Sequence, residues 1–351
     1  MVEKENKANF EIIRESPNFK FEKFLTNMND NSIGFNDKFE VFTYNKDNNQ
    51  YIISPGIKTY LIYIIRISDS QLFKSLKGHK ECISVLNYFQ NNKNKKEEYI
   101  LSIDIKGILL IWDLNNDFKI KHKMNTKEYV IYSSIIMFNV NNNNNYIITS
   151  NSYKSENENK AYSKRYSLSN GKFINCINNT NSNTTYLILP WYDKVNNINY
   201  IIECCLGKIS IINLIKNKLY HEFLSEHEEE AFTGGFVYNK NNNYYLCTTS
   251  IHGEIKFWDL ENKKFDKKIS CGKDYNLLSI IQWSDKYIIF ADNNSNKSFK
   301  ILDMDELKII SNVGGKHHNP ITCIKKINHS LYGKCIITSG NDNLIIIWSL
   351  K

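Results

Sequence analysis

The amino-acid sequence predicts an all-β fold, a seven-bladed β-propeller of four-stranded antiparallel blades, from three observations. Apolar segments of strand length recur along the 351 residues with a period near 45. In each repeat one of these segments ends in a similar apolar anchor residue, and helix-length amphipathic segments are almost absent. A period of about 40–45 residues with strand alternation fits blades arranged around an axis. A β-sandwich, the alternative, has no reason to repeat at that interval.

Anchor residues mark the third strand of each predicted blade. The clearest third strands, residues 107–114, 254–260 and 344–350, each contain a tryptophan. The anchors are Ile65, Trp112, Tyr166, Ile212, Trp258, Leu302 and Trp348. Successive anchors are 47, 54, 46, 46, 44 and 46 residues apart, which predicts seven units.

Second strands recur in all seven units and support the same count. Most begin with tyrosine, continue with aliphatic residues and end near a small polar residue. They are residues 51–54, 99–102, 146–149, 200–203, 245–248, 287–290 and 335–338. Agreement between two independent sets of strands makes seven blades the prediction.

Several motifs resemble those of the WD-repeat (WD40) family. Trp-Asp pairs occur at residues 112–113 and 258–259, and Gly78-His79 places a histidine 33 residues before Trp112. The resemblance covers roughly residues 19–351 and is strong in three blades. It implies a propeller in which the two ends of the chain share one blade.

The resemblance also implies hydrogen-bonded tetrads of a loop histidine, a second-strand Ser or Thr, a turn Asp and the anchor Trp. The members are His317, Thr338, Asp342 and Trp348 in the last blade, His79, Ser102 and Trp112 in the second, and His227, Thr248 and Trp258 in the fifth. Lys106 and His252 stand where the second and fifth blades would need the Asp. Because a buried indole N–H and a buried hydroxyl need partners, we expect these residues to be structural.

The chain ends on the third strand of the last blade, which would leave an unpaired edge. Residues 19–25 begin with strand-like alternation and precede the first blade's own opening strand near residues 39–44. We therefore expect residues 19–25 to close the ring. Residues 1–17 are expected to form a flexible tail, and residues 18–351 a single propeller.

The net charge of +8 arises from 45 Lys and Arg against 37 Asp and Glu, with only three arginines, Arg14, Arg66 and Arg165. Arginine supplies the bidentate fork used for phosphate and guanine, so a lysine excess indicates solubility more than nucleic-acid recognition. The N-terminus lacks the apolar core of a signal peptide, and the longest apolar stretch, residues 60–65, cannot span a bilayer. We expect a cytoplasmic or nuclear protein without membrane insertion.

The sequence contains no GxSxG, P-loop, HExxH or CxxC motif. His227, beside an acidic run, and His317, beside His318, already have tetrad roles. We therefore expect no catalytic residue, no metal site and no cofactor.

We expect partners to bind the upper face, which we define as the loops between blades together with the turns between second and third strands. The candidate residues combine tyrosines with charged and polar side chains, a mixture common at protein interfaces. They are Lys80, Glu81, Tyr129, Tyr153, Glu228, Glu229, His252, Asp274, Tyr275 and Asn341.

The sequence thus predicts a non-enzymatic protein–protein interaction scaffold, a subunit of a multiprotein complex that binds other proteins or peptides. An RNA- or ribosome-associated propeller that exploits the lysine excess is the main alternative. A propeller hydrolase with catalytic groups around the channel is the third class.

Overall fold

The computed structural model describes most of the chain. The described residues are 10–15, 42–46, 49–56, 60–68, 71–91, 97–127, 131–141, 144–150, 162–177, 184–272, 276–292, 297–314, 316–340, 342 and 344–350. The described part has no helix with the length and hydropathy needed to cross a lipid bilayer. Apart from strands, its regular structure is one 3-10 turn, η2 (Leu114–Asn116).

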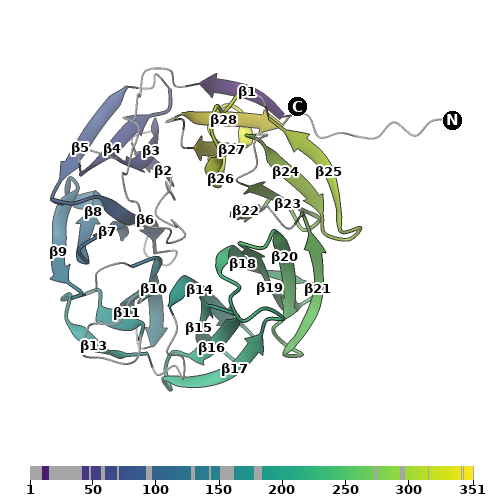
Figure 1. Cartoon of the computed structure of the whole chain (residues 1–351). Helices are drawn as coiled ribbons and strands as arrows, with labels where there is room; N and C mark the ends of the chain where they lie inside the picture. The colour runs from purple at the N-terminus through teal and green to yellow at the C-terminus, as the bar shows by residue number, and fades with distance from the viewer. Residues whose placement is uncertain are drawn as a thin grey trace.

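Seven four-stranded antiparallel sheets stand around a central axis in chain order, so the predicted fold class is confirmed (Figure 1). Blades 1 to 6 each use four consecutive strands, from β2–β5 to β22–β25. Blade 7 contains β26, β27 and β28, with β1 at its outer edge.

The strands fall into four sets by their distance from the axis. The innermost, first strands are β2 (Phe42–Lys46), β6 (Ile83–Gln90), β10 (Ser134–Asn141), β14 (Thr185–Asp193), β18 (Phe232–Lys240), β22 (Leu277–Gln282) and β26 (Ile321–His329). The second strands are β3 (Asn49–Pro55), β7 (Glu98–Asp104), β11 (Asn144–Thr149), β15 (Ile198–Cys205), β19 (Asn243–Ser250), β23 (Tyr287–Asp292) and β27 (Gly333–Gly340). The third strands are β4 (Leu61–Arg66), β8 (Ile108–Asp113), β12 (Lys164–Ser167), β16 (Lys208–Asn213), β20 (Glu254–Asp259), β24 (Phe299–Asp303) and β28 (Ile345–Leu350). The outer strands are β5 (Leu72–Lys77), β9 (Lys119–Asn125), β13 (Phe173–Cys176), β17 (Lys218–Leu224), β21 (Lys264–Ser270), β25 (Lys308–Val313) and β1 (Phe10–Glu15).

The predicted second and third strands lie where the sequence placed them. Each predicted second-strand segment falls within a second strand, and each of the seven anchors lies on a third strand. All seven anchors are buried, from Leu302 at 0% exposure to Tyr166 at 5%. The period in the sequence is therefore the spacing of buried third-strand side chains.

The hydrophobic core is divided between neighbouring blades. One cluster joins Ile53 of blade 1 to Trp112 of blade 2, and the others described follow the same rule around the ring. The cluster that contains Ile52 of β3 and Ile337 of β27 seals blade 1 against blade 7. Because each blade buries its faces on two neighbours, no blade has a complete core by itself.

The aspartate that follows a third-strand anchor caps the turn to the outer strand. The Oδ1 atom of Asp113 accepts from the backbone N–H groups of Asn115 and Asn116. Asp259 and Asp303 accept from the two equivalent N–H groups after their own strands. The Trp-Asp pair thus combines a core side chain with a turn that the carboxylate holds by an Asx-type bond.

A one-residue β-bulge recurs where each outer strand passes the anchor. The register shifts fall between Ile64 and Ile65, Ile111 and Trp112, Arg165 and Tyr166, Ile211 and Ile212, Phe257 and Trp258, and Ile301 and Leu302. The outer-strand residues opposite the anchors are all apolar: Leu72, Ile120, Phe173, Leu219, Phe265 and Ile309. A bulge increases the local twist, which bends each outer strand around the rim.

The pairing of β1 with β28 has this same bulge. Ile12 lies opposite the anchor Trp348, and Arg14 lies opposite Ile347, so Ile13 is the extra residue. Residues 19–25, expected to close the ring, lie outside the described residues. The strand beside β28 comes instead from residues 10–15, within the segment expected to be a tail. Closure by an N-terminal strand stays a prediction, with residues 10–15 as the segment to test.

Side chains near the rim also fasten each blade to the next. His122 Nε2 lies 2.9 Å from the carbonyl oxygen of Leu168, just after the third strand of the neighbouring blade. Arg165 Nη1 donates to the carbonyl of Leu214 at 2.8 Å, and Lys267 Nζ to that of Met304 at 2.9 Å. These bonds satisfy the equivalent carbonyl, two residues after the anchor, at the contacts of blades 2 and 3, 3 and 4, and 5 and 6. They hold the turn of one blade against its neighbour.

Candidate functional site

The network of blade 7 joins its four predicted members in one chain of hydrogen bonds. Trp348 Nε1 donates to Thr338 Oγ1 at 2.8 Å, and His317 Nε2 lies 2.8 Å from the same oxygen. His317 Nδ1 lies 2.9 Å from Asp342 Oδ2. Burial alone would raise the pKa of Asp342, but its hydrogen bonds with His317 and with backbone N–H groups outweigh burial and lower the pKa.

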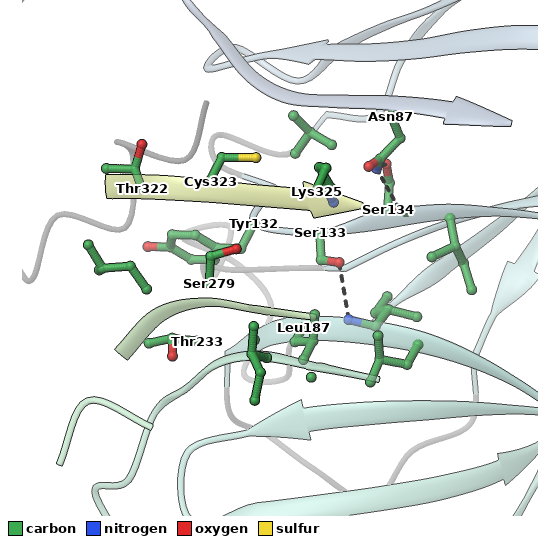
Figure 2. A pocket seen from close by; sticks show the side chains of 18 of the residues that line it. Asn87, Tyr132, Ser133, Ser134, Leu187, Thr233, Ser279, Thr322, Cys323 and Lys325 are labelled. Carbon is green, nitrogen blue, oxygen red and sulfur yellow. Dashed lines mark hydrogen bonds between the residues drawn. The ribbon is translucent and has the colours of Figure 1, made fainter. Parts of the chain in front are cut away.

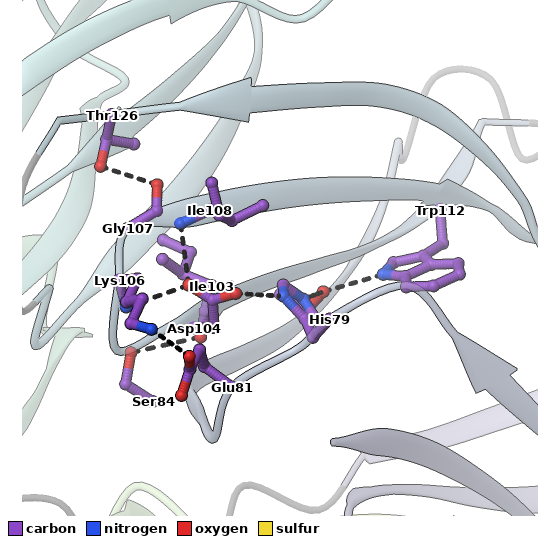
Figure 3. A network of polar contacts seen from close by, with 11 residues as sticks. His79, Glu81, Ser84, Ile103, Asp104, Lys106, Gly107, Ile108, Trp112 and Thr126 are labelled. Atoms are coloured by element: carbon purple, nitrogen blue, oxygen red, sulfur yellow. Dashed lines mark hydrogen bonds and ion pairs between the residues drawn. The ribbon is translucent and has the colours of Figure 1, made fainter.

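Blade 2 has the same chain of bonds, with a carboxylate that the sequence analysis missed (Figure 3). Trp112 Nε1 donates to Ser102 Oγ at 2.8 Å, which lies 2.7 Å from His79 Nε2. His79 Nδ1 lies 3.0 Å from Asp104 Oδ2. The expectation that blade 2 lacks its acid was therefore wrong. Lys106 turns outward and pairs with Glu81 instead.

Two positions in this turn can deliver the carboxylate to the same place. Asp104 follows Ser102 by two residues, whereas Asp342 follows Thr338 by four, and blade 7 has Gly340 at the position of Asp104. A Cβ atom on Gly340 would lie 3.3 Å from His317 Nδ1 and 3.2 Å from Asp342 Oδ1. The same Cβ atom would also lie 2.7 Å from the carbonyl oxygen of Pro320, which is too close for a side chain. Position 340 therefore faces the histidine ring as Asp104 does in blade 2, but it has to be glycine, and Asp342 supplies the carboxylate.

The direction of these bonds follows from the donors. An indole N–H can only donate, so Ser102 Oγ accepts from Trp112 and has its own proton left for His79 Nε2. The carboxylate of Asp104 can only accept, so His79 Nδ1 donates to it. Although this order resembles a Ser-His-Asp triad, Ser102 is 0% exposed and each group already has a partner. The network is built to hold a loop on a strand.

In blade 5 the predicted tetrad does not form. Trp258 Nε1 donates to Thr248 Oγ1 at 3.0 Å, but His227 is exposed, and its ring lies 5.5 Å from that of His252. The expected role of His227 in a tetrad is therefore wrong.

In blade 5 a buried lysine holds the loop to the blade, as the histidine does in blades 2 and 7. Lys256, at 2% exposure, lies opposite Thr248, and its Nζ is 2.6 Å from Glu230 Oε2. The same Nζ lies 3.0 Å from Ser225 Oγ and 3.0 Å from Glu254 Oε2. Burial alone would raise the pKa of Glu254, but Lys256 and Lys268 outweigh it and lower the pKa. These bonds hold the loop 225–230 on the blade where a histidine would otherwise do so.

The predicted partner-binding residues divide into two groups. Lys80, Glu228 and Glu229 are exposed on upper-face loops, Glu81 is paired with Lys106, and His252 is half-buried. Five others lie outside the described residues: Tyr129, Tyr153, Asp274, Tyr275 and Asn341. The described members come from blades 2 and 5 and do not form one cluster.

A second bulge recurs at the start of the first strands, at the upper end of the central channel. In β6, β14, β18, β22 and β26 the register shifts by one residue near the first pair. The extra residues are Ser84, Tyr186, Thr233, Leu278 and Thr322, and Tyr132 has the same place ahead of β10. Bulges re-aim side chains at strand ends. The sequence analysis did not predict this set, because a bulge of one residue that recurs from blade to blade does not alter the spacing between anchors.

Two of these residues form an aromatic pair between blades 3 and 4. The ring centroids of Tyr132 and Tyr186 lie 5.2 Å apart, and both side chains are half-buried. Tyr132 lines the channel (Figure 2). Half-buried tyrosines that pack on each other can offer a rigid apolar surface and a hydroxyl at little entropic cost.

Among the described residues, no group of three or more His, Cys, Asp or Glu side chains is placed to hold a metal ion. A comparison with known protein families found none that matches the chain, and a comparison with curated proteins found no match either. The likeness to WD-repeat proteins therefore rests on the motifs in the sequence and on the networks of blades 2 and 7.

Proposed function

We propose that this chain is a WD-repeat-type propeller that acts as a non-enzymatic scaffold and binds partner polypeptides at its upper face, as a cytoplasmic or nuclear subunit of a multiprotein complex. The observation that carries the proposal is the recurrent bulge at the start of the first strands, because five of its six described residues line the central channel. Tyr132 and Tyr186 are its aromatic members. A rigid aromatic pair with polar neighbours is typical of the centre of a protein interface.

The charged residues around this end of the channel support a polypeptide partner. Glu228 and Glu229 are exposed on a loop that the buried Lys256–Glu230 pair holds in place. Lys80 is exposed on the corresponding loop of blade 2, beside the Glu81–Lys106 pair. Charges of both signs on firmly held loops favour an uneven polypeptide surface over the uniformly negative backbone of RNA.

Affinity purification from native cells, followed by mass spectrometry, tests the proposal. We expect the variant Tyr132→Ala/Tyr186→Ala to lose a set of co-purifying proteins that the wild type retains. Tyr332→Ala is the matched control, because Tyr332 is 54% exposed at the turn between β26 and β27, on the opposite face.

Three results would contradict the scaffold at this face. The first is retention of every partner by the double tyrosine variant and by a second variant with Glu228→Lys and Glu229→Lys. The second is co-purification of RNA whose binding weakens steeply as salt rises, which would favour the RNA-associated alternative. The third is turnover of an ester or peptide substrate that is lost on substitution of a channel residue, which would favour the hydrolase.

A further inference from the structure

The lower face, at the end of the propeller opposite the upper face, is formed by the turns between first and second strands and between third and outer strands. In three neighbouring segments of this face, residues 169–174 of blade 3 and residues 192–197 and 215–220 of blade 4, an exposed lysine stands directly beside an exposed large apolar residue. The pairs are Lys172-Phe173, Lys194-Val195 and Ile215-Lys216. We call these three segments the lower patch.

Hydrogen bonds join the three segments of the lower patch into one surface. The backbone N–H of Leu214 donates to the carbonyl of Asn199 at 3.0 Å, which links the two turns of blade 4. Asn217 Nδ2 donates to the carbonyl of Cys176, on β13 of blade 3, at 3.2 Å. The patch therefore spans the contact between blades 3 and 4.

The turns of blade 4 hold their apolar side chains in an exposed position. Asp193 Oδ1 accepts from the N–H groups of Val195 and Asn196 at 2.9 and 3.0 Å, and Asn213 Oδ1 accepts from the N–H of Lys216 at 2.9 Å. Asx-type bonds of this kind fix the backbone of a turn. Val195 is 81% exposed and Ile215 48%, so an external surface is needed to bury them.

The exposed charges of the lower patch are all positive. Its four exposed lysines form no ion pair with any described residue: Lys172, Lys194, Lys216 and Lys218. Its one acidic residue, Asp193, is 2% exposed and caps its own turn. The adjoining turn of blade 5 adds one charge of each sign, Glu261 and Lys263, and so does not alter this excess.

A lipid surface fits this combination better than a protein does. Lysine is depleted at protein interfaces, where arginine is enriched instead. Lysines beside aliphatic and aromatic side chains are typical of proteins that lie on anionic membranes. The apolar groups enter the boundary between headgroups and acyl chains, and each lysine near the surface strengthens binding.

We propose that the lower patch docks the propeller on a membrane surface rich in anionic phospholipid. Phe173, Val195 and Ile215 lie at the level of the headgroups in this contact, with the lysines among the phosphates, and no segment crosses the bilayer. The inference goes beyond the proposed scaffold function. Because the patch lies on the lower face, a docked propeller still presents its upper face to partner polypeptides.

Co-sedimentation of the full chain with vesicles tests the inference. Vesicles of phosphatidylcholine alone are compared with vesicles that also contain about 30 mol% phosphatidylserine. We expect the anionic vesicles to bind about tenfold more tightly, with binding that weakens as salt rises from about 50 to about 500 mM. Equal binding to both kinds of vesicle, or binding to neither at about 1 mM lipid, overturns the inference.

Variants locate the contact. We expect Val195→Asp/Ile215→Asp and Lys216→Glu/Lys218→Glu each to lower binding to the anionic vesicles by about tenfold or more. Leu331→Asp is the matched control, because Leu331 is also 81% exposed on a lower-face turn but belongs to blade 7.

Unchanged binding in both double variants, or an equal loss in Leu331→Asp, also overturns the inference, with folding checked by thermal unfolding. A labelled peptide that alternates Glu with Val covers the competing occupant. If the double variants lost this peptide but kept the vesicles, the lower patch would belong to an acidic polypeptide and the inference would fail. The scaffold proposal is judged separately, by the proteins that the double tyrosine variant loses.

Discussion

His79 Nδ1 lies 3.0 Å from Asp104 Oδ2, and both side chains are buried. Burial would raise the pKa of Asp104, but the hydrogen bonds from His79, Ile108 N–H and Lys106 N–H outweigh it and lower the pKa. A carboxyl whose pKa is lower in the folded state stabilises the fold above its unfolded pKa of about 3.9, and this contribution is lost as pH falls through the folded pKa.

We therefore predict that Asp104→Asn lowers the free energy of unfolding at pH 7 by about 1–3 kcal/mol, because the variant loses a charged hydrogen-bond acceptor for His79. Urea unfolding at several pH values measures the effect. The difference from the wild type should shrink once the pH is below about 4. Lys106→Ala is the control, since its exposed pair with Glu81 should matter little. A larger loss for Lys106→Ala than for Asp104→Asn would contradict this assignment.

The sequence was sufficient for the repeat but not for the networks. Anchors and second strands were predictable because burial between blades demands an apolar residue at a fixed spacing. The role of Asp104 was not predictable, because a carboxylate two or four residues after the second-strand Ser or Thr can reach the same histidine. Only the path of the backbone through the turn decides which position is used. His227 has the right spacing in blade 5, yet Lys256 at a core position fills the place of its ring. A charged residue within an apolar third strand was the signal for that replacement.

The buried pair of blade 5 gives the second prediction. Lys256→Met would leave Glu230, at 0% exposure, without its cation, so we expect a loss of about 3–5 kcal/mol. Blades 2 and 7 have Leu110 and Ile346 at the position of Lys256. We therefore expect Lys256→Met combined with Glu230→Leu to recover most of the loss.

A double-mutant cycle by chemical unfolding measures this coupling. Lys268→Met is the matched control, because Lys268 also pairs with Glu254 but is about one-third exposed. Its cost should be at most about 1 kcal/mol. Equal losses of unfolding free energy for Lys256→Met and Lys268→Met would show that burial does not increase what the Lys256–Glu230 pair contributes to stability.

The contact between blades 2 and 3 gives a prediction for pH. Burial lowers the pKa of His122, although its bond to the carbonyl of Leu168 acts the other way. The unfolded chain then takes up a proton first, so the fold loses stability as pH falls from the unfolded pKa of about 6.5 through the lower folded value. His122→Gln offers a donor that does not titrate. The slope of unfolding free energy between pH 7 and 5 should be smaller in this variant, and an unchanged slope would refute the role of His122.

Closure of the ring can be tested through the register of β1. Glu11 lies opposite Ser349, and directly opposed Cα atoms in an antiparallel pair are about 4.5–5.5 Å apart, a spacing that a disulfide accepts. We predict that Glu11→Cys with Ser349→Cys forms a cross-link under mild oxidation, located by peptide mass mapping. Because the bond closes nearly the whole chain into one loop, it should raise stability by up to about 5 kcal/mol.

The competing segment supplies the control for this test. Lys20→Cys or Glu22→Cys, each with Ser349→Cys, places a thiol in the strand that the sequence analysis expected to close the ring. Should residues 10–15 be the outer strand, these pairs cross-link slowly and add no stability. Efficient cross-linking through residue 20 or 22, with none through residue 11, would instead return the closure to residues 19–25. The recurring bulge favours the first outcome, because β1 passes Trp348 with the one-residue shift that six other outer strands show at their anchors.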